Sequence, residues 1–290
     1  MKLMTTQNYI KPPFKLSIFT TASYPHERGD MVDAAMTCYA QLADEIIYME
    51  GGDLRKQEYD LFWVDEKVRI IKHHWPQEFK WTLIGEQFQR GYEAASGNWV
   101  IHSDLDFIFH EEDYQKIREV LEQSDAPAVM FYKKQFVLPD RFNVKSRLVL
   151  AVNKGKYGDR IRFDSGGDLC QPSLDGKEIR IEDLPDTQLG FWNYEKILKT
   201  KEQISDDVGR MDRAYFRHFG KYLYGDGTDQ GAFEGWMEMM RGRLSKPHEH
   251  IPLEKHPKIM HNIIKELMPN QFGYSAFGLE KNDYVKGLAQ

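Results

Sequence analysis

The sequence predicts an α/β protein in which helices flank a central, largely parallel β-sheet. Apolar, β-branched runs alternate with segments of helical periodicity over the first half of the chain. Several of these runs end in small or acidic residues, which suits strands that open into loops at one edge of a sheet. The 290 residues are 41% hydrophobic and 29% charged, which are ordinary values for a globular protein.

The first three predicted strands lie within the first 75 residues. Residues 15–23 (KLSIFTTAS) form an apolar run that ends in small residues, typical of a buried strand. Asp30 precedes an apolar periodic segment over residues 31–43, so we expect a helix with Asp30 as its N-cap. Residues 44–53 predict a second strand that ends in a Gly-Gly loop, and residues 68–74 a short third strand.

The same alternation continues to Leu138. Residues 81–97 predict a helix that stops at its final glycine, and residues 98–104 predict a fourth strand that runs into acidic residues. Residues 110–123 predict a helix with acids in its first turn, and residues 126–138 a further strand. We therefore expect an α/β core over residues 1–138.

From residue 139 to residue 290 the pattern is less regular, and we expect a second lobe there. Loops rich in Gly and Asp alternate with a helical stretch over residues 193–220. A glycine-rich loop then enters another helix within residues 224–243.

Composition excludes several classes of function. The net charge of −6 argues against binding nucleic acid through a field of the whole protein. Cys38 and Cys170 lie far apart without CxxC spacing, so neither a disulfide framework nor a structural zinc site is expected. No apolar run approaches the roughly 20 residues that cross a bilayer. We expect a cytoplasmic protein with no membrane span.

The strongest candidate for chemistry is the pair Asp104 and Asp106, which follows the fourth predicted strand. Side chains two positions apart on an extended segment point to the same side. Two such carboxylates suit a hard divalent cation, Mn²⁺ or Mg²⁺, whose free positions could bind a diphosphate. The alternative is a solvated strand end.

Three segments carry a resemblance to known enzymes: residues 15–23, residues 44–53 and residues 85–113 (GEQFQRGYEAASGNWVIHSDLDFIFHEED). Over about the first 125 residues the chain resembles the A-type fold of nucleotide-sugar glycosyltransferases, a Rossmann-like mixed sheet flanked by helices, and especially glycosyltransferase family two. The resemblance implies transfer of a sugar from a nucleotide-diphosphate donor, with UDP favoured, to a hydroxyl acceptor.

The resemblance also implies roles for individual residues. Asp104 would lie near the ribose or the metal, and Asp106 would bind the metal directly. The residues expected to face the nucleoside are Thr21, Ala22 and either Glu50 or Asp53, although such positions are also ordinary turn residues.

A third metal ligand in such enzymes is often a histidine from the far end of the fold. His256 is favoured because the following proline restricts the backbone of a returning loop, and His248 and His250 are its rivals. Each of the three is equally well explained as a surface histidine.

An inverting transfer needs a carboxylate base for the acceptor hydroxyl. Asp229 is the candidate, because the resembled family often supplies this base from an acidic pair after a glycine-rich loop. The chain departs from that pair by having Thr228, so Asp226 and Glu234 remain rivals. Asp229 could instead merely cap its helix, and without a base the mechanism would be retaining.

Other side chains have weaker claims. His110 is expected to be a cap or surface residue, and the lysines and arginines of residues 196–203 and 239–243 either assist phosphate or form a solvated face. The polar loop around Asp164 and Asp168 could reach over a substrate or form a tight turn. Aromatic residues that could stack on a sugar or belong to the core are Trp192, Tyr194 and Trp236.

Two further functions compete with glycosyl transfer. Nucleotidyl transfer to a sugar phosphate would usually bring a glycine-rich phosphate loop after the first strand, and residues 19–30 contain no GxG. A nucleotide- or carbohydrate-binding module without catalysis is also compatible with the fold. The acceptor could be a glycan, a lipid-linked sugar, a protein or a modified nucleic acid, and the oligomeric state stays open.

Overall fold

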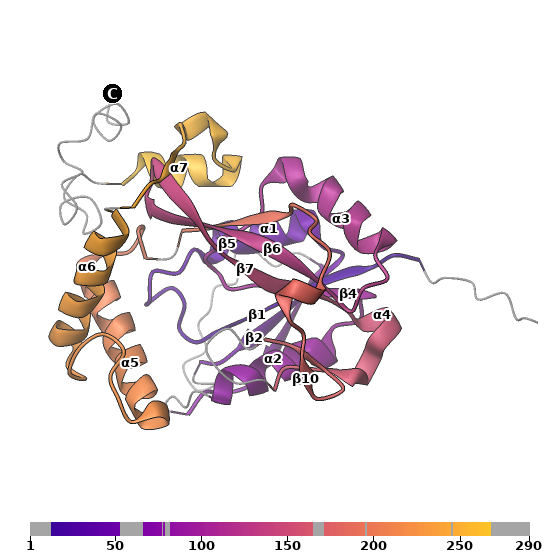
Figure 1. The fold of residues 1–290 in the computed structure, drawn as a ribbon, viewed down its shortest axis with the longest axis horizontal. Helices are drawn as coiled ribbons and strands as arrows, with labels where there is room; N and C mark the ends of the chain where they lie inside the picture. The colour runs from indigo at the N-terminus through magenta and orange to yellow at the C-terminus, as the bar shows by residue number, and fades with distance from the viewer. Residues whose placement is uncertain are drawn as a thin grey trace, which may run out of the picture.

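A computed structural model describes residues 13–52, 66–76, 78, 82–164, 171–194, 196–244 and 246–267 (Figure 1). Of the residues named above, Asp53, Asp168 and Cys170 lie outside the described residues. In the described part, no helix is both long enough and apolar enough to cross a membrane.

The core of the molecule is a mixed sheet with the strand order β3-β2-β1-β4-β7-β6-β11-β5, and β12 pairs with β7. Its first four strands run parallel to one another. They are β3 (Val68–Lys72), β2 (Glu45–Glu50), β1 (Leu16–Ala22) and β4 (Trp99–His102). The predicted α/β class, with a central sheet flanked by helices, is confirmed.

In the other half of the sheet, one long strand, β7, runs antiparallel to its neighbours. β7 (Arg141–Asn153) is antiparallel to both β4 and β6 (Ala128–Leu138). β11 (Gly190–Asn193) is parallel to β6 and antiparallel to β5 (Phe107–Ile108). Strands from both sides of the predicted boundary at residue 138 therefore belong to one sheet.

Helices cover both faces of this sheet. α1 (Val32–Leu42) and α3 (Tyr114–Gln123) bury apolar residues in one core cluster, beside which lies α7 (His261–Lys265). α2 (Thr82–Ala94) packs through Phe88 and Tyr92 into a second cluster.

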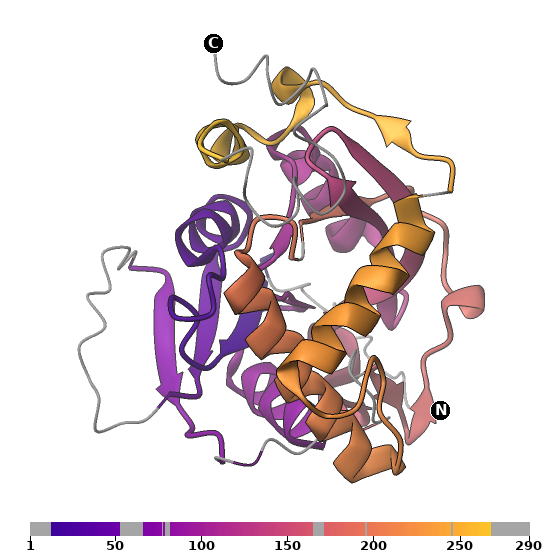
Figure 2. The ribbon, with the colours of Figure 1, turned by 90° about the vertical axis from the view of Figure 1, so that its left-hand side faces the viewer.

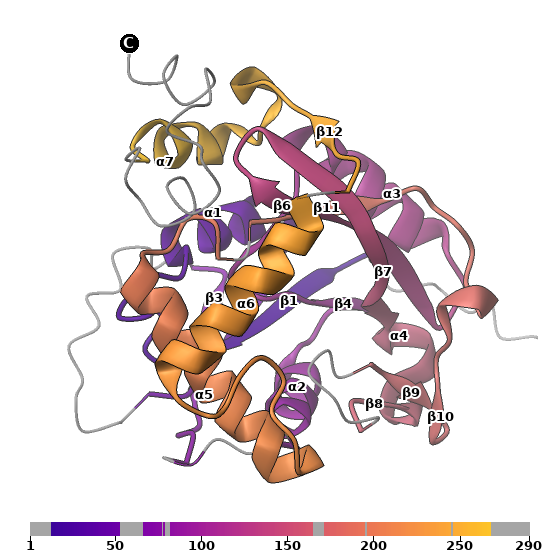
Figure 3. The same cartoon turned by 60° about the vertical axis from the view of Figure 1, so that its left-hand side comes forward.

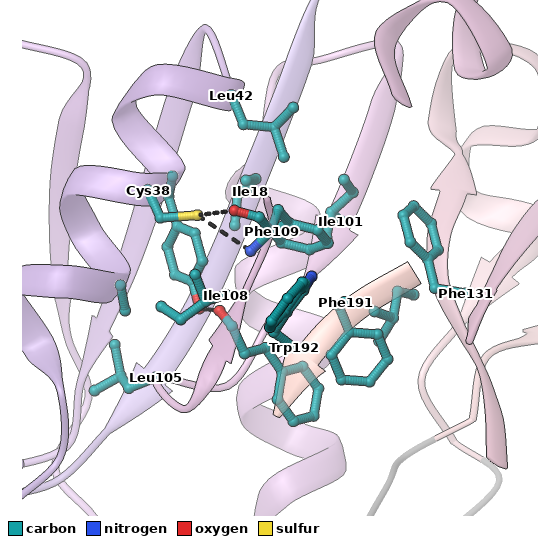
Figure 4. Close-up of a cluster of buried hydrophobic side chains, with 14 of the residues drawn as sticks. Ile18, Cys38, Leu42, Ile101, Leu105, Ile108, Phe109, Phe131, Phe191 and Trp192 are labelled. Carbon is teal, nitrogen blue, oxygen red and sulfur yellow. Dashed lines mark hydrogen bonds between the residues drawn. The ribbon is translucent and has the colours of Figure 1, made fainter. Parts of the chain in front are cut away.

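In the first cluster, α1 packs against the segment that follows β4 (Figure 4). The Cys38 thiol on α1 accepts a 3.3 Å hydrogen bond from the Phe109 amide and donates one of 3.5 Å to the Phe109 carbonyl. Burial raises the pKa of Cys38 to about 11, so the thiol stays protonated at neutral pH, and its role is structural.

Two long helices from the second half form an antiparallel hairpin. α5 (Lys201–Phe219) begins with a capping box between Thr200 and Gln203, and α6 (Asp229–Leu244) packs against it. Figures 2 and 3 show the two helices side by side, beyond the carboxyl end of β1. Trp236 of α6 is only 1% exposed in a third core cluster, so the core interpretation of this residue is confirmed.

The remaining elements are short. A small antiparallel sheet contains β8 (Ile161–Arg162), β9 (Ser173–Leu174) and β10 (Lys177–Glu178). β12 (Glu249–His250) extends the main sheet, and α4 (Lys154–Tyr157) follows β7. Single 3₁₀ turns occur at Glu111–Asp113, Gly158–Arg160, Ile181–Asp183, Leu253–Lys255 and Lys258–Met260.

Three local predictions need correction. The N-cap of α1 is Met31, because the Asp30 carboxylate lies 2.6 Å from the Lys199 ammonium instead of capping the helix. The helix predicted to stop at Gly97 ends at Ala94. Helix α5 begins eight residues later than predicted, because residues 190–193 belong to strand β11.

Candidate active site

A pocket of about 280 Å³ opens at the carboxyl ends of β1 and β4. Parallel strands bring these ends to one edge of the sheet, where ligand sites of α/β proteins usually lie. The pocket is lined by Thr21, Ala22, Arg28, Asp30, Trp75, Ile84, Phe88, Asp104, Leu105, Asp106, Lys196, Lys199, Asp207 and Met211.

The predicted pair Asp104 and Asp106 reaches this pocket on a firmly held turn. The backbone carbonyl of Asp104 accepts a 2.6 Å hydrogen bond from the buried Tyr39 hydroxyl. The Asp106 carboxylate accepts a 3.0 Å hydrogen bond from the side-chain amide of Asn193. The backbone carbonyl of Asp106 accepts a 3.2 Å hydrogen bond from the backbone amide of Tyr194. Contacts from α1 and from the segment around β11 therefore set the position of both carboxylates.

The two carboxylates influence each other's charge. Burial, followed by the neighbouring charge of Asp106, raises the pKa of Asp104 well above its ordinary value, and Lys133 and Arg28 oppose this. A cation placed at the pair would relieve the repulsion. Hard carboxylate oxygens also fit Mg²⁺ or Mn²⁺, which commonly takes one or two carboxylates and fills its other positions with water and phosphate.

In the same pocket, basic side chains surround Asp207. Its carboxylate lies 3.1 Å from the Arg28 guanidinium, 2.8 Å from the Lys199 ammonium and 3.9 Å from that of Lys196. Burial alone would raise the pKa of Asp207, but these cations outweigh it and hold the pKa well below the ordinary value. One wall of the pocket is therefore an ion network that stays charged.

The residues predicted to face a nucleoside are partly brought together. Thr21 and Ala22 line the pocket. Glu50 lies at the end of neighbouring β2, where its carboxylate accepts a 2.8 Å hydrogen bond from the Gly52 amide, and it is not among the lining residues. Burial raises the pKa of Glu50.

The predicted histidine ligands lie away from the pocket lining. His256 is buried, its Nδ1 is 2.8 Å from the Tyr194 hydroxyl, and burial lowers its pKa to about 4. His250 is exposed with Nδ1 3.9 Å from Asp140, and burial lowers the pKa of His248. Within the described ranges, no three His, Cys, Asp or Glu side chains are grouped to hold a metal ion.

The three candidate bases gather at the start of α6, and none of them is among the lining residues. Asp229 forms a 2.6 Å ion pair with Arg213, and Asp226 accepts hydrogen bonds from the amide and hydroxyl of Thr228. Glu234 is exposed and pairs with Gln230 at 2.6 Å.

The aromatic residues, His110 and Asp164 make contacts that belong to the fold. Trp192 and Tyr194 are buried in the core, and His110 caps a 3₁₀ turn by accepting a 3.2 Å hydrogen bond from Glu112. Asp164, two residues after β8, accepts a 2.6 Å hydrogen bond from the hydroxyl of Ser173 on β9.

Sequence reasoning missed most of the charged wall. It noted the lysines of residues 196–203 as possible phosphate ligands, and Lys196 and Lys199 do line the pocket. Arg28 and Asp207 had no recognisable motif, because they meet only after folding and lie 179 positions apart. The arginines Arg241 and Arg243 are not among the lining residues.

No family model matches the chain, and no curated protein matches it. Solved structures do resemble it, nucleotide-sugar glycosyltransferases among them. One is TarS of S. aureus, with 8% identity, a TM-score of 0.39, and coverage of 71% of this chain and 72% of that one. Another is mannosyltransferase PcManGT from Pyrobaculum calidifontis, solved with GDP-Man and Mn²⁺, with 7% identity, a TM-score of 0.38 and coverage of 77% and 69%.

A mycobacterial protein is 16% identical, with a TM-score of 0.31 and coverage of 43% of this chain and 41% of its own length. The present chain thus spans less than half of that protein. Likeness at these levels supports no assignment of substrate or of residue roles.

Proposed function

We propose that the protein is a metal-dependent glycosyltransferase that uses a nucleotide-diphosphate sugar, with UDP favoured as the nucleotide. One observation carries the proposal: Asp104 and Asp106 share a pocket with Arg28 and Lys199 at the carboxyl ends of two parallel strands. Carboxylates for a divalent cation and cations for phosphate are the side chains that a sugar diphosphate requires.

The donor would occupy the pocket with its nucleoside toward β1. Thr21 and Ala22 would contact the nucleoside, and either Glu50 or Asp53 stays predicted to face it. Asp104 and Asp106 would hold Mn²⁺ or Mg²⁺, which supplies positive charge for the departing diphosphate. Lys196 and Arg28 would add fixed positive charge in the same pocket, and His256 stays a predicted third ligand.

The transfer step forms a bond between the acceptor oxygen and the anomeric carbon, and it breaks the bond from that carbon to the diphosphate. For inversion, the acceptor proton passes to a carboxylate base. The prediction for this base is Asp229, with Asp226 and Glu234 as alternatives. We propose that residues 139–290 supply the acceptor side of the site, and that the enzyme acts in the cytoplasm on a hydroxyl-bearing glycan, lipid, protein or modified nucleic acid.

The deciding experiment is isothermal titration calorimetry of the full chain with UDP, GDP and their sugars, with and without Mn²⁺. We expect one nucleotide class to bind in a Mn²⁺-dependent manner, and Asp106→Asn to abolish this dependence. Asp125→Asn is the matched control, because Asp125 is an exposed aspartate paired with Lys156 on the surface. Nucleotide binding that is equally strong with and without Mn²⁺ would contradict the metal site.

Turnover separates the proposal from its rivals. Mass spectrometry would show a free nucleoside diphosphate formed from a nucleotide sugar and an acceptor for glycosyl transfer, and pyrophosphate formed from a nucleoside triphosphate and a sugar phosphate for nucleotidyl transfer. Binding without either product would indicate a binding module. The Asp229→Asn variant should bind the donor and fail to transfer the sugar, and normal turnover would move the base to Asp226 or Glu234 or favour a retaining route.

A further inference from the structure

The last turn of α5 and the loop that joins it to α6 carry an unusual surface. Five large hydrophobic residues are more than a third exposed in the described part of the chain, and four of them lie within residues 216–223. We call these eight residues the hairpin tip. The four are Phe216 (42% exposed), Phe219 (46%), Tyr222 (39%) and Leu223 (39%).

These side chains are presented by an ordered turn. The Asp212 carboxylate is fully buried and accepts hydrogen bonds from the backbone amides of Leu223 and Tyr224 at 2.6 and 2.8 Å. The rings of Phe216 and Tyr222 stack with centroids 4.4 Å apart. The apolar surface is therefore held outward by the fold.

The charge of the hairpin tip differs from that of the whole protein. The chain has a net charge of −6, but residues 213–225 (RAYFRHFGKYLYG) contain no Asp or Glu. Arg217 and Lys221 are exposed within the tip, beside the exposed His218. Cations that flank exposed aromatic and aliphatic side chains are the composition of segments that lie in a lipid headgroup layer.

The position of the tip also suits docking onto a surface. In Figure 3 the end of α5 is the lowest part of the molecule, so no other labelled element lies below it. Met211 on the same helix lines the pocket, and Phe216 follows five residues later, about 8 Å along the helix axis. A surface that held the tip would lie close to the pocket.

We propose that the hairpin tip docks the protein onto anionic membrane surfaces, with Phe219 and Leu223 entering the headgroup layer and Lys221 and Arg217 facing lipid phosphates. The charge complementarity favours a bilayer rich in acidic lipid. This docking is independent of the chemistry in the pocket.

Vesicle co-sedimentation of the full chain tests the proposal, using phosphatidylcholine vesicles with and without phosphatidylglycerol. We expect binding only to vesicles that contain phosphatidylglycerol, weakened by added salt. Lys221→Glu should weaken this binding at least about fivefold, and Phe219→Ser with Leu223→Ser about tenfold or more.

Matched controls are available on the same chain. Val144 is the fifth exposed hydrophobic residue, 46% exposed on β7, so Val144→Ser should leave vesicle binding unchanged. Arg241→Glu places the same charge change near the other end of the helical hairpin and should have a much smaller effect than Lys221→Glu. Unchanged melting temperatures would show that each variant folds.

One variant tests the proposal through a signal that appears on binding, so that the test does not depend only on variants that lose binding. In Tyr222→Trp, the added indole fluorescence should shift to shorter wavelength with phosphatidylglycerol vesicles and stay unshifted with phosphatidylcholine alone. Absence of vesicle binding, or equal loss in Val144→Ser, would overturn the proposal. Self-association, or oligonucleotide binding, that is lost in the tip variants without any lipid binding would also overturn it, in favour of a second copy or a nucleic acid.

Discussion

The side-chain amide of Asn193 donates a 3.0 Å hydrogen bond to the carboxylate of Asp106, although the two residues lie 87 positions apart. Asn193 is 1% exposed at the end of β11, and its neighbour in the ladder is Phe107 on β5. The pairing of β11 with β5 thus fixes the position of one carboxylate oxygen of Asp106, while the side chain still lines the pocket.

Because Asp106 is the proposed metal ligand, we expect Asn193→Ala to weaken Mn²⁺ binding and turnover by about 10- to 100-fold, the usual cost of losing a partner of such a ligand. Calorimetric titration with Mn²⁺ and a nucleotide would measure the effect. Asn143→Ala is a suitable control, since it makes the same truncation in the same sheet at a position that faces Gln135 of β6 in the ladder. Equal effects in the two variants would mean that the hydrogen bond only supports the fold.

The raised pKa of Asp104 predicts a pH dependence of stability. A carboxyl group whose pKa is higher in the folded state stabilises that state below the unfolded pKa, near 4, and this contribution is lost as pH rises through the folded pKa. Asp104→Asn should therefore raise the melting temperature at neutral pH, and the difference should vanish below about pH 4. A constant difference across this range, measured by circular dichroism, would contradict the shift.

Ionised Asp104 destabilises the fold at neutral pH, whereas the low pKa of Asp207 predicts that its ionised carboxylate stabilises the fold there. Asp207→Asn removes one of the two carboxylates that pair with Arg28 and Lys199 and leaves Asp30 as the other, so we expect a loss of about 1.5–3 kcal/mol in unfolding free energy at neutral pH. Urea denaturation would measure it. Asp229→Asn breaks a pair whose side chains are 41% and 50% exposed and should cost about 1 kcal/mol or less.

The packing of α6 predicts opposite effects for two of its glycines. A Cβ at Gly235 would meet the carbonyl oxygen of Tyr224, so Gly235→Ala must push the helix away from the preceding loop. At Gly242 a Cβ would meet no atom within 4 Å, and Gly242→Ala should stabilise the helix by about 0.5–1 kcal/mol. Chemical denaturation of both variants checks the sign of each change.

Local sequence patterns predicted much of the fold. Residues 15–23 contain β1, whose apolar residues are nearly continuous, as in a strand buried on both faces. Residues 126–138 contain β6, in which apolar residues at both ends flank Lys133, Lys134 and Gln135. β7 was not predicted, although its first part, RFNVKSR, alternates polar and apolar residues as a half-buried strand does.

The candidate site was less predictable. Asp104 and Asp106 lie in one motif after one strand, and both line the pocket. Asp207, by contrast, lies inside a charged helix whose sequence resembles any solvated helix. Its partners Arg28 and Lys199 come from other segments, so only the tertiary structure shows that this carboxylate is buried.

The central place of β7 has a consequence for how the chain is made. β4 pairs with β1 on one side, and within the described residues its other edge is covered by β7 alone, which ends at Asn153. While a ribosome is still adding residues before that point, the parallel strands present an open edge that can pair with other chains. The nascent protein is therefore most vulnerable to aggregation between the synthesis of β4 and the arrival of β7, and a fragment that ends at residue 138 would keep that edge permanently.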